Sequence, residues 1–134
     1  MSSHDISQRV TSTVLVTGAL GQLGAAFLTR MPARSRVVGV DTDTLDITRE
    51  ADVAAFARDM RPSLIINCAA FNDVDGAERA PEQARLVNCE AVRTLARVAE
   101  ECGATLVHYS TDFVFDGTQE EPYVEENAPA PKSV

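Results

Sequence analysis

The feature that most constrains the fold is a stretch near the N-terminus, residues 13–24, with the sequence TVLVTGALGQLG. A β-branched run breaks at Gly18 and passes directly into a helical pattern over residues 22–31. Glycine recurs at three-residue spacing, at Gly18, Gly21 and Gly24. A strand, a tight turn and a helix start in this order are typical of a dinucleotide site.

Each glycine has a separate expected role. Gly18 lets the backbone reverse where a Cβ would clash. Gly21 lets the chain approach a pyrophosphate, and Gly24 lets the helix lie against the strand. The N–H groups at the helix start would face the phosphates. The spacing differs from the commoner Gly-x-Gly-x-x-Gly, and glycines also occur in structural βα turns, but the context favours nucleotide binding.

A second buried strand is predicted over residues 36–40, and it ends at Asp41. About 20 residues past the glycines, an acidic side chain accepts hydrogen bonds from the adenosine ribose. A carboxylate there repels a 2′-phosphate and so favours NAD over NADP. The alternative is a solvated turn carboxylate beside Asp43.

Residues 43–48 are expected to form one turn or a short strand, in which Asp46 or Thr48 caps the next helix. Arg61-Pro62 ends that helix. Apolar residues recur along it at helical spacing and are expected in the core, namely Val53, Phe56 and Met60.

The unbroken apolar run at residues 63–68 predicts a strand buried on both faces. Ala69 and Ala70 follow it and leave room for a flat ligand, and residues 71–76 are expected to be a loop. A helix over residues 81–101, closed by Gly103, carries an apolar stripe: Ala84, Val87, Ala91, Leu95, Val98 and Cys102. Cys89 and Cys102 are therefore interpreted as helix and core residues rather than ligands.

A further strand is predicted over residues 105–110, and His108 within it is interpreted as a packed strand residue in preference to a catalytic one. Ser110, Thr111 and Asp112 cluster at the carboxyl end, which is the ligand-binding edge of an open α/β sheet. They could cap a turn or orient a substrate hydroxyl or carbonyl, and their position favours the second role.

Composition excludes several classes of function. The net charge of −8 argues against DNA or RNA as a partner, although backbone amides can still hold a dinucleotide. The longest apolar runs fall short of the ~20 residues of a membrane span. Cys68, Cys89 and Cys102 lack C-x-x-C spacing, which favours a reducing cytoplasm. No metal site is expected.

The alternation of strands and helices predicts an α/β, Rossmann-type, doubly wound fold with a mostly parallel sheet and helices on both faces. This domain would span residues 13–116. Residues 1–12 are expected to form a flexible leader, and residues 117–134 an acidic, proline-rich loop or tail.

Several of these segments together resemble dTDP-4-dehydrorhamnose reductases, a family of extended short-chain dehydrogenase/reductases. They are TGALGQLG, VDTDTLDIT, INCAAFNDVDGAE, Val87-Asn88 and HYSTDFVFDG. The resemblance runs from Thr13 to the end of the chain, and HYSTDFVFDG is its most specific part. It implies reduction of a dTDP-4-keto sugar with NADH or NADPH in the cytoplasm.

The resemblance also implies residue roles. Thr111 would bond the substrate C4 oxygen, and Asp112 would assist it or bind the sugar. The cofactor roles fall to Gly21, Gln22 and Leu23 at the pyrophosphate, Asp41 at the ribose, Asp46 and Ile47 at the adenine, and Ala69, Ala70 and Phe71 along the cofactor with Tyr109 nearby.

One departure from the family is large, because the family's Tyr-x-x-x-Lys proton donor is absent from the sequence. The chain is therefore expected to be an N-terminal, cofactor-binding portion with little or no activity alone. Truncation would expose a sheet edge and favour self-association. The alternatives are a non-catalytic dinucleotide-binding module, like the β subunit of methionine adenosyltransferase, or a purely structural fragment.

Overall fold

The computed structural model describes residues 12–133. The expected leader over residues 1–12 lies outside them, apart from Ser12, at which the first strand begins. The elements in chain order are β1 (Ser12–Thr17), α1 (Gln22–Arg30), β2 (Ser35–Val40), α2 (Glu50–Met60), β3 (Leu64–Asn67), α3 (Val74–Arg79), α4 (Pro81–Arg85), the π-helical η1 (Leu86–Glu90), α5 (Ala91–Cys102), β4 (Thr105–His108) and the 3-10 turn η2 (Asp112–Val114).

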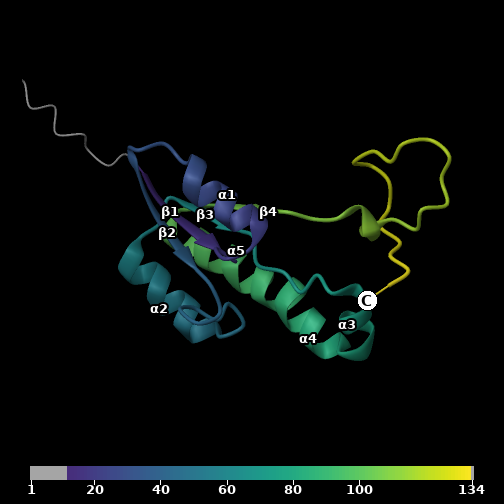
Figure 1. The fold of residues 1–134 in the computed structure, drawn as a ribbon, viewed down its shortest axis with the longest axis horizontal. Coiled ribbons are helices and arrows are strands. Elements are labelled where there is room, and N and C mark those ends of the chain that lie inside the picture. Colours follow the sequence, from purple (N-terminus) through teal and green to yellow (C-terminus); the bar gives the residue numbers. More distant parts are fainter. Residues whose placement is uncertain (1–11, 134) are drawn as a thin grey trace, which may run out of the picture.

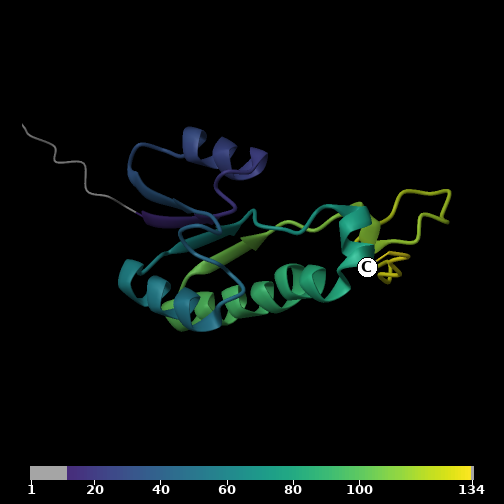
Figure 2. The same ribbon diagram turned by 60° about the horizontal axis from the view of Figure 1, so that its bottom comes forward.

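The four strands form one sheet in the order β2-β1-β3-β4, and every neighbouring pair among them is parallel. Helix α1 covers one face of this sheet, while α2 and α5 cover the other (Figures 1 and 2). The chain therefore winds to both sides of β1. This arrangement confirms the predicted doubly wound, parallel α/β fold.

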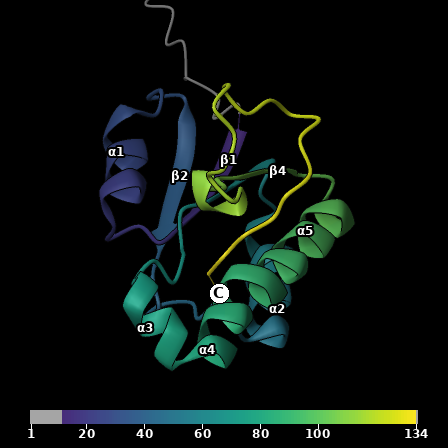
Figure 3. The same ribbon diagram turned by 90° about the vertical axis from the view of Figure 1, so that its right-hand side faces the viewer.

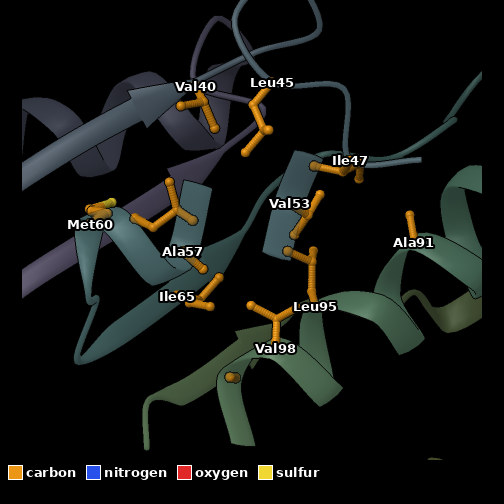
Figure 4. Close-up of a cluster of buried hydrophobic side chains, with 12 residues drawn as sticks. Val40, Leu45, Ile47, Val53, Ala57, Met60, Ile65, Ala91, Leu95 and Val98 are labelled. Carbon is orange, nitrogen blue, oxygen red and sulfur yellow. The ribbon is translucent and has the colours of Figure 1, made fainter. Parts of the chain in front are cut away.

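The larger part of the core lies between the sheet and the pair α2 and α5 (Figure 4). Leu15 and Ile65 project from the sheet and Leu95 from α5, and none of the three is exposed. The stripe predicted on α2 is confirmed at Val53 and Met60, while Phe56 is only partly buried. The opposite face buries a smaller cluster of Val14, Val16 and Ile66 under α1.

The predicted cap of α2 by Asp46 or Thr48 is wrong. The N-cap residue is Arg49, and no side chain caps the helix. The Asp46 carboxylate instead accepts hydrogen bonds from the hydroxyl and the backbone N–H of Thr48, at 2.7 and 2.9 Å. These two bonds lower the pKa of Asp46. The two side chains that could have capped α2 thus bond to each other in an Asx-type turn.

Two expectations about the region before α5 also need correction. Residues 71–76 are not all loop, because α3 begins at Val74, and the Asp73 side chain accepts a hydrogen bond from the Gly76 N–H at 2.9 Å. The helix predicted over residues 81–101 contains the π-helical turn η1 between α4 and α5. Within that turn Cys89 is exposed, so it is not a core residue.

Gly103 ends α5 in the left-handed conformation, as predicted, with a φ of 67°. None of the helices in residues 12–133 combines the length and apolar character that a membrane span requires. The same residues hold no cluster of three or more His, Cys, Asp or Glu side chains suited to a metal ion.

Candidate functional site

The glycine-rich turn lies at the carboxyl end of β1, and two of its glycines are required by the fold. Gly18 has a φ of 65°, and a Cβ there would lie 2.6 Å from the backbone nitrogen of Ala69. A Cβ on Gly24 would lie 2.2 Å from the carbonyl oxygen of Gly18. These contacts confirm the steric roles expected of Gly18 and Gly24, because any side chain would push the turn away from β3 or α1 away from the turn.

Gly21 is less crowded than Gly18 and Gly24. It is exposed, it has a negative φ, and a Cβ there would meet only the Gly18 carbonyl oxygen at 3.3 Å. The residue is the N-cap of α1 but supplies no side-chain cap. The first-turn N–H groups of Gln22 and Leu23 have no carbonyl partner within the helix. An anion could approach them across the bare Cα of Gly21.

Asp41 lies beside this turn. Its carboxylate accepts hydrogen bonds from the N–H of Leu20 and from the N–H of Thr42, both at 2.9 Å. The first of these bonds ties the end of β2 to the turn after β1. Each carboxylate oxygen keeps a second lone pair, so Asp41 can still accept a hydrogen bond from a ribose hydroxyl.

A cleft of about 680 Å³ opens at the carboxyl ends of β3 and β4, the end of the sheet that faces the viewer in Figure 3. It brings together residues from the start of α1, the loop after β3 and the loop after β4. Six of the predicted site residues line it: Leu23, Ala69, Ala70, Phe71, Tyr109 and Thr111. The others do not line it, namely Gly18, Gly21, Gln22, Gly24, Asp41, Asp46, Ile47 and Asp112.

Of the two roles left open by the sequence, the structure shows the turn cap for Thr111, and it places the residue at the cleft. Its hydroxyl oxygen accepts a hydrogen bond from the Phe113 N–H at 3.2 Å, so it caps η2. The same hydroxyl donates to a carboxylate oxygen of Asp112 at 3.2 Å, and the residue lines the cleft. Thr111 is thus a fixed hydroxyl at the cleft wall, with Asp112 behind it.

The two residues expected near the adenine lie apart from this cleft. Asp46 borders a separate depression of about 420 Å³ between the loop after β2 and α2. The Ile47 side chain is only 7% exposed and packs in the core cluster. Mainly the backbone of Ile47 therefore remains available to a ligand.

The sequence reasoning gave no chemical role to Asn88, which shapes the cleft wall. Its side-chain amide donates to the carbonyl oxygen of Phe71 and accepts from the Phe71 N–H, both at 2.8 Å. This pair of bonds holds the loop after β3 against η1. The interpretation of His108 as a packed residue is wrong, because His108 is exposed and lines the cleft.

The segment after η2 folds back toward the same cleft. Phe115 and Tyr123 stack with their ring centroids 4.3 Å apart, and the Ala130 N–H donates to the Val114 carbonyl oxygen at 2.8 Å. This return brings Pro131 and Ser133 to the cleft wall. Burial raises the pKa of the Cys68 thiol, another lining group, which keeps it protonated.

Comparison with known proteins gives consistent matches. A family model described as the RmlD substrate binding domain matches residues 12–134. A dTDP-4-dehydrorhamnose reductase of Burkholderia thailandensis is 40% identical over 118 residues, which are 88% of this chain and 40% of that protein. A dTDP-4-keto-6-deoxy-D-glucose reductase of Streptomyces niveus is 40% identical over 123 residues, 91% of this chain and 43% of that protein.

Among solved structures, the dTDP-4-dehydrorhamnose reductase of Bacillus anthracis, crystallised in complex with NADP, superimposes with a TM-score of 0.88 at 37% identity. The match covers 91% of this chain and 44% of that one. The chain thus spans well under half the length of these relatives.

Proposed function

This chain belongs to the RmlD substrate binding domain family, and from that premise we propose that it is the dinucleotide-binding part of an NAD(P)H-dependent dTDP-sugar reductase. The relatives named above are reductases of dTDP-4-keto sugars. The proposed reaction is the reduction of dTDP-4-dehydro-6-deoxy-L-mannose to dTDP-L-rhamnose.

One observation carries the proposal. The start of α1, which follows the glycine-rich turn, lines the same cleft as Thr111 through Leu23. The rings of Phe27 on α1 and Tyr109 beside Thr111 lie 6.2 Å apart. A dinucleotide with its pyrophosphate at the turn would therefore extend toward Thr111.

The remaining roles follow from chemistry and position. The bound cofactor would supply a hydride to the ketone carbon, and the product oxygen would need a hydrogen-bond donor. Thr111 has a hydroxyl at the cleft wall for that purpose, with Asp112 to orient it. Ala69, Ala70 and Phe71 would form a flat wall along the cofactor. Asp46 and the backbone of Ile47 would lie toward the adenine.

Asp41 bears on the choice between NADH and NADPH. Its carboxylate would accept hydrogen bonds from the ribose and repel a 2′-phosphate, which favours NADH. The related Bacillus anthracis reductase was crystallised with NADP. Titrations with both reduced cofactors will rank them.

The test is a fluorescence titration of the chain with NADH and NADPH, comparing wild type with Gly21→Val. A Cβ on Gly21 would make one tight contact, with the Gly18 carbonyl oxygen at 3.3 Å, and the rest of the valine side chain would lie where the pyrophosphate would approach. We expect Gly21→Val to weaken binding by at least about tenfold, or ~1.4 kcal/mol.

Thr29→Val is the matched control, because it places the same β-branched side chain on an exposed position of α1. It should bind as the wild type does. Thermal unfolding of the ligand-free variants must show that Gly21→Val still folds. Equal binding by wild type and a folded Gly21→Val would remove the proposed site.

A further inference from the structure

A row of three polar residues crosses the sheet where the strands end. Thr17 of β1 is in register with Asn67 of β3, and Asn67 is in register with His108 of β4. Two residues earlier, the same face presents Leu15, Ile65 and Leu106, which join the core cluster. Thr17 is 0% exposed and Asn67 is 1% exposed. Two polar side chains therefore occupy buried positions on the same face of the sheet as the core residues.

The orientation of the Asn67 amide is fixed by a backbone donor. The N–H of Ala69 donates to the Asn67 side-chain oxygen at 3.2 Å, and the Thr17 hydroxyl donates to the same oxygen at 2.5 Å. A flipped amide would turn its NH₂ group toward the Ala69 N–H, and two donors would face each other in a buried site. An unpaired buried donor is unfavourable, because it loses its hydrogen bonds to water without replacing them. The Asn67 NH₂ group must therefore face β4.

This orientation dictates the state of His108. The Asn67 amide nitrogen lies 3.1 Å from Nδ1 of the imidazole. An amide NH₂ group has no acceptor lone pair, so Nδ1 must accept. An imidazole that accepts at Nδ1 carries its one proton on Nε2. Because Asn67 is buried and His108 is exposed, the Nε2 side of the ring faces the open cleft.

The geometry points to His108 as an uncharged Nε2–H donor of the cleft that binds an oxygen acceptor of the ligand. The tautomer is set by Asn67, whose amide is oriented by the Ala69 N–H. A ring nitrogen that bears a proton donates, so its partner is an oxygen acceptor of the ligand. The ligand contact rests on the proposed function, whereas the tautomer does not.

The tautomer is tested by long-range ¹H–¹⁵N correlation of the imidazole rings in the full chain at about pH 8, above the ordinary titration range of histidine. His4 is the other histidine, and His4→Gln assigns the signals. We expect the nitrogen with strong couplings to both carbon-bound ring protons, Nε2, to be the protonated one. A protonated Nδ1, or comparable amounts of both tautomers, would overturn the assignment.

Two variants test whether Asn67 sets the tautomer. In Asn67→Asp both side-chain oxygens accept, so Nδ1 of His108 should become protonated. Thr17→Val removes a hydroxyl but leaves the Ala69 N–H to orient the amide, so the wild-type tautomer should remain. If Asn67→Asp fails to fold, Thr17→Val alone tests the proposal. A changed His108 tautomer in Thr17→Val would contradict the orientation of the Asn67 amide by the Ala69 N–H.

NADPH is the probe for the ligand contact. Binding should shift the Nε2 resonance of His108. His108→Gln keeps an N–H group near the position of Nε2 and should retain affinity within about twofold, whereas His108→Asn keeps only an acceptor for Asn67 and should weaken binding about tenfold. If NADPH shifts the amides of the glycine-rich turn but not His108, the contact is wrong. If no signal shifts, the proposed function fails and the tautomer result stands.

Discussion

At the scale of single residues, Asp116 has a pH-dependent role that can be measured. The Thr118 N–H and the Tyr123 hydroxyl both donate to its carboxylate, at 3.1 and 2.8 Å, and together they lower its pKa from 3.8 to about 2. Because the pKa of Asp116 is lower in the folded protein than in the unfolded chain, its ionised carboxylate stabilises the folded loop at any pH above the pKa of the unfolded chain. We expect this stabilisation to be complete above about pH 5 and lost as the pH falls through about 2. A carboxyl ¹³C titration of Asp116 measures it.

Tyr123→Phe provides the matched variant for this titration. It removes one hydroxyl while it keeps the ring that stacks on Phe115. The Asp116 pKa should rise only part of the way, because the largest contribution comes from Thr118. An Asp116 that titrates at its ordinary value in the wild type would show that these bonds do not persist in solution.

Some individual residues were predictable from spacing and others were not. Gly18 and Gly24 were predictable because a strand followed at once by a helix leaves no space for a Cβ at either position. His108 was not, because alternation with apolar neighbours does not show that a strand ends and its last side chain opens into a cleft. Asn88 was recognised only as part of a family motif, since its bonds to Phe71 depend on a loop that the pattern does not define.

At the scale of elements, the contact between α2 and α5 is expected to contribute most to stability. Leu95 is fully buried in the core cluster shared by these helices and the sheet. Leu95→Ala should lower the free energy of unfolding by about 2–5 kcal/mol, because it removes buried methyl groups and leaves a cavity. Denaturant unfolding followed by circular dichroism measures the change.

Leu28→Ala on α1 is the control, with the same chemical change at a side chain that is 40% exposed. It should cost less than about 1 kcal/mol. A loss for Leu28→Ala as large as that for Leu95→Ala would contradict the expectation that burial of Leu95 in the core cluster is what makes its truncation costly.

The strands were predicted within two residues at each end. The prediction of a buried second strand is wrong for most of β2, since only Val40 is buried and β2 lies at an edge of the sheet. The helix ends were less predictable. Asp46 and Thr48 have the side chains of a cap but bond to each other. The π-helical turn η1 interrupts a stripe that reads as continuous, since Ala84 and Ala91 are buried on both sides of it.

At the scale of the whole molecule, we expect the given residues to bind cofactor without efficient proton donation, because they contain no Tyr-x-x-x-Lys motif. Neither tyrosine has a lysine four residues on, since Phe113 follows Tyr109 and Asn127 follows Tyr123 at that spacing. Thr111 can donate a hydrogen bond but is a poor acid. We expect cofactor binding with little or no turnover of dTDP-4-dehydrorhamnose, measured by NAD(P)H absorbance. Clear turnover above a Thr111→Val control would contradict this.

The order of the strands determines how amino-acid substitutions can affect the cleft. From β1 the chain passes through α1 on one side to β2, and it then returns through α2 on the other side to β3. Because the two connections lie on opposite faces of the sheet, they separate at the carboxyl ends of the strands. The cleft at this end therefore results from the path of the backbone rather than from small side chains. Replacing the residues on its walls alters which molecule it accepts, while the opening itself is retained.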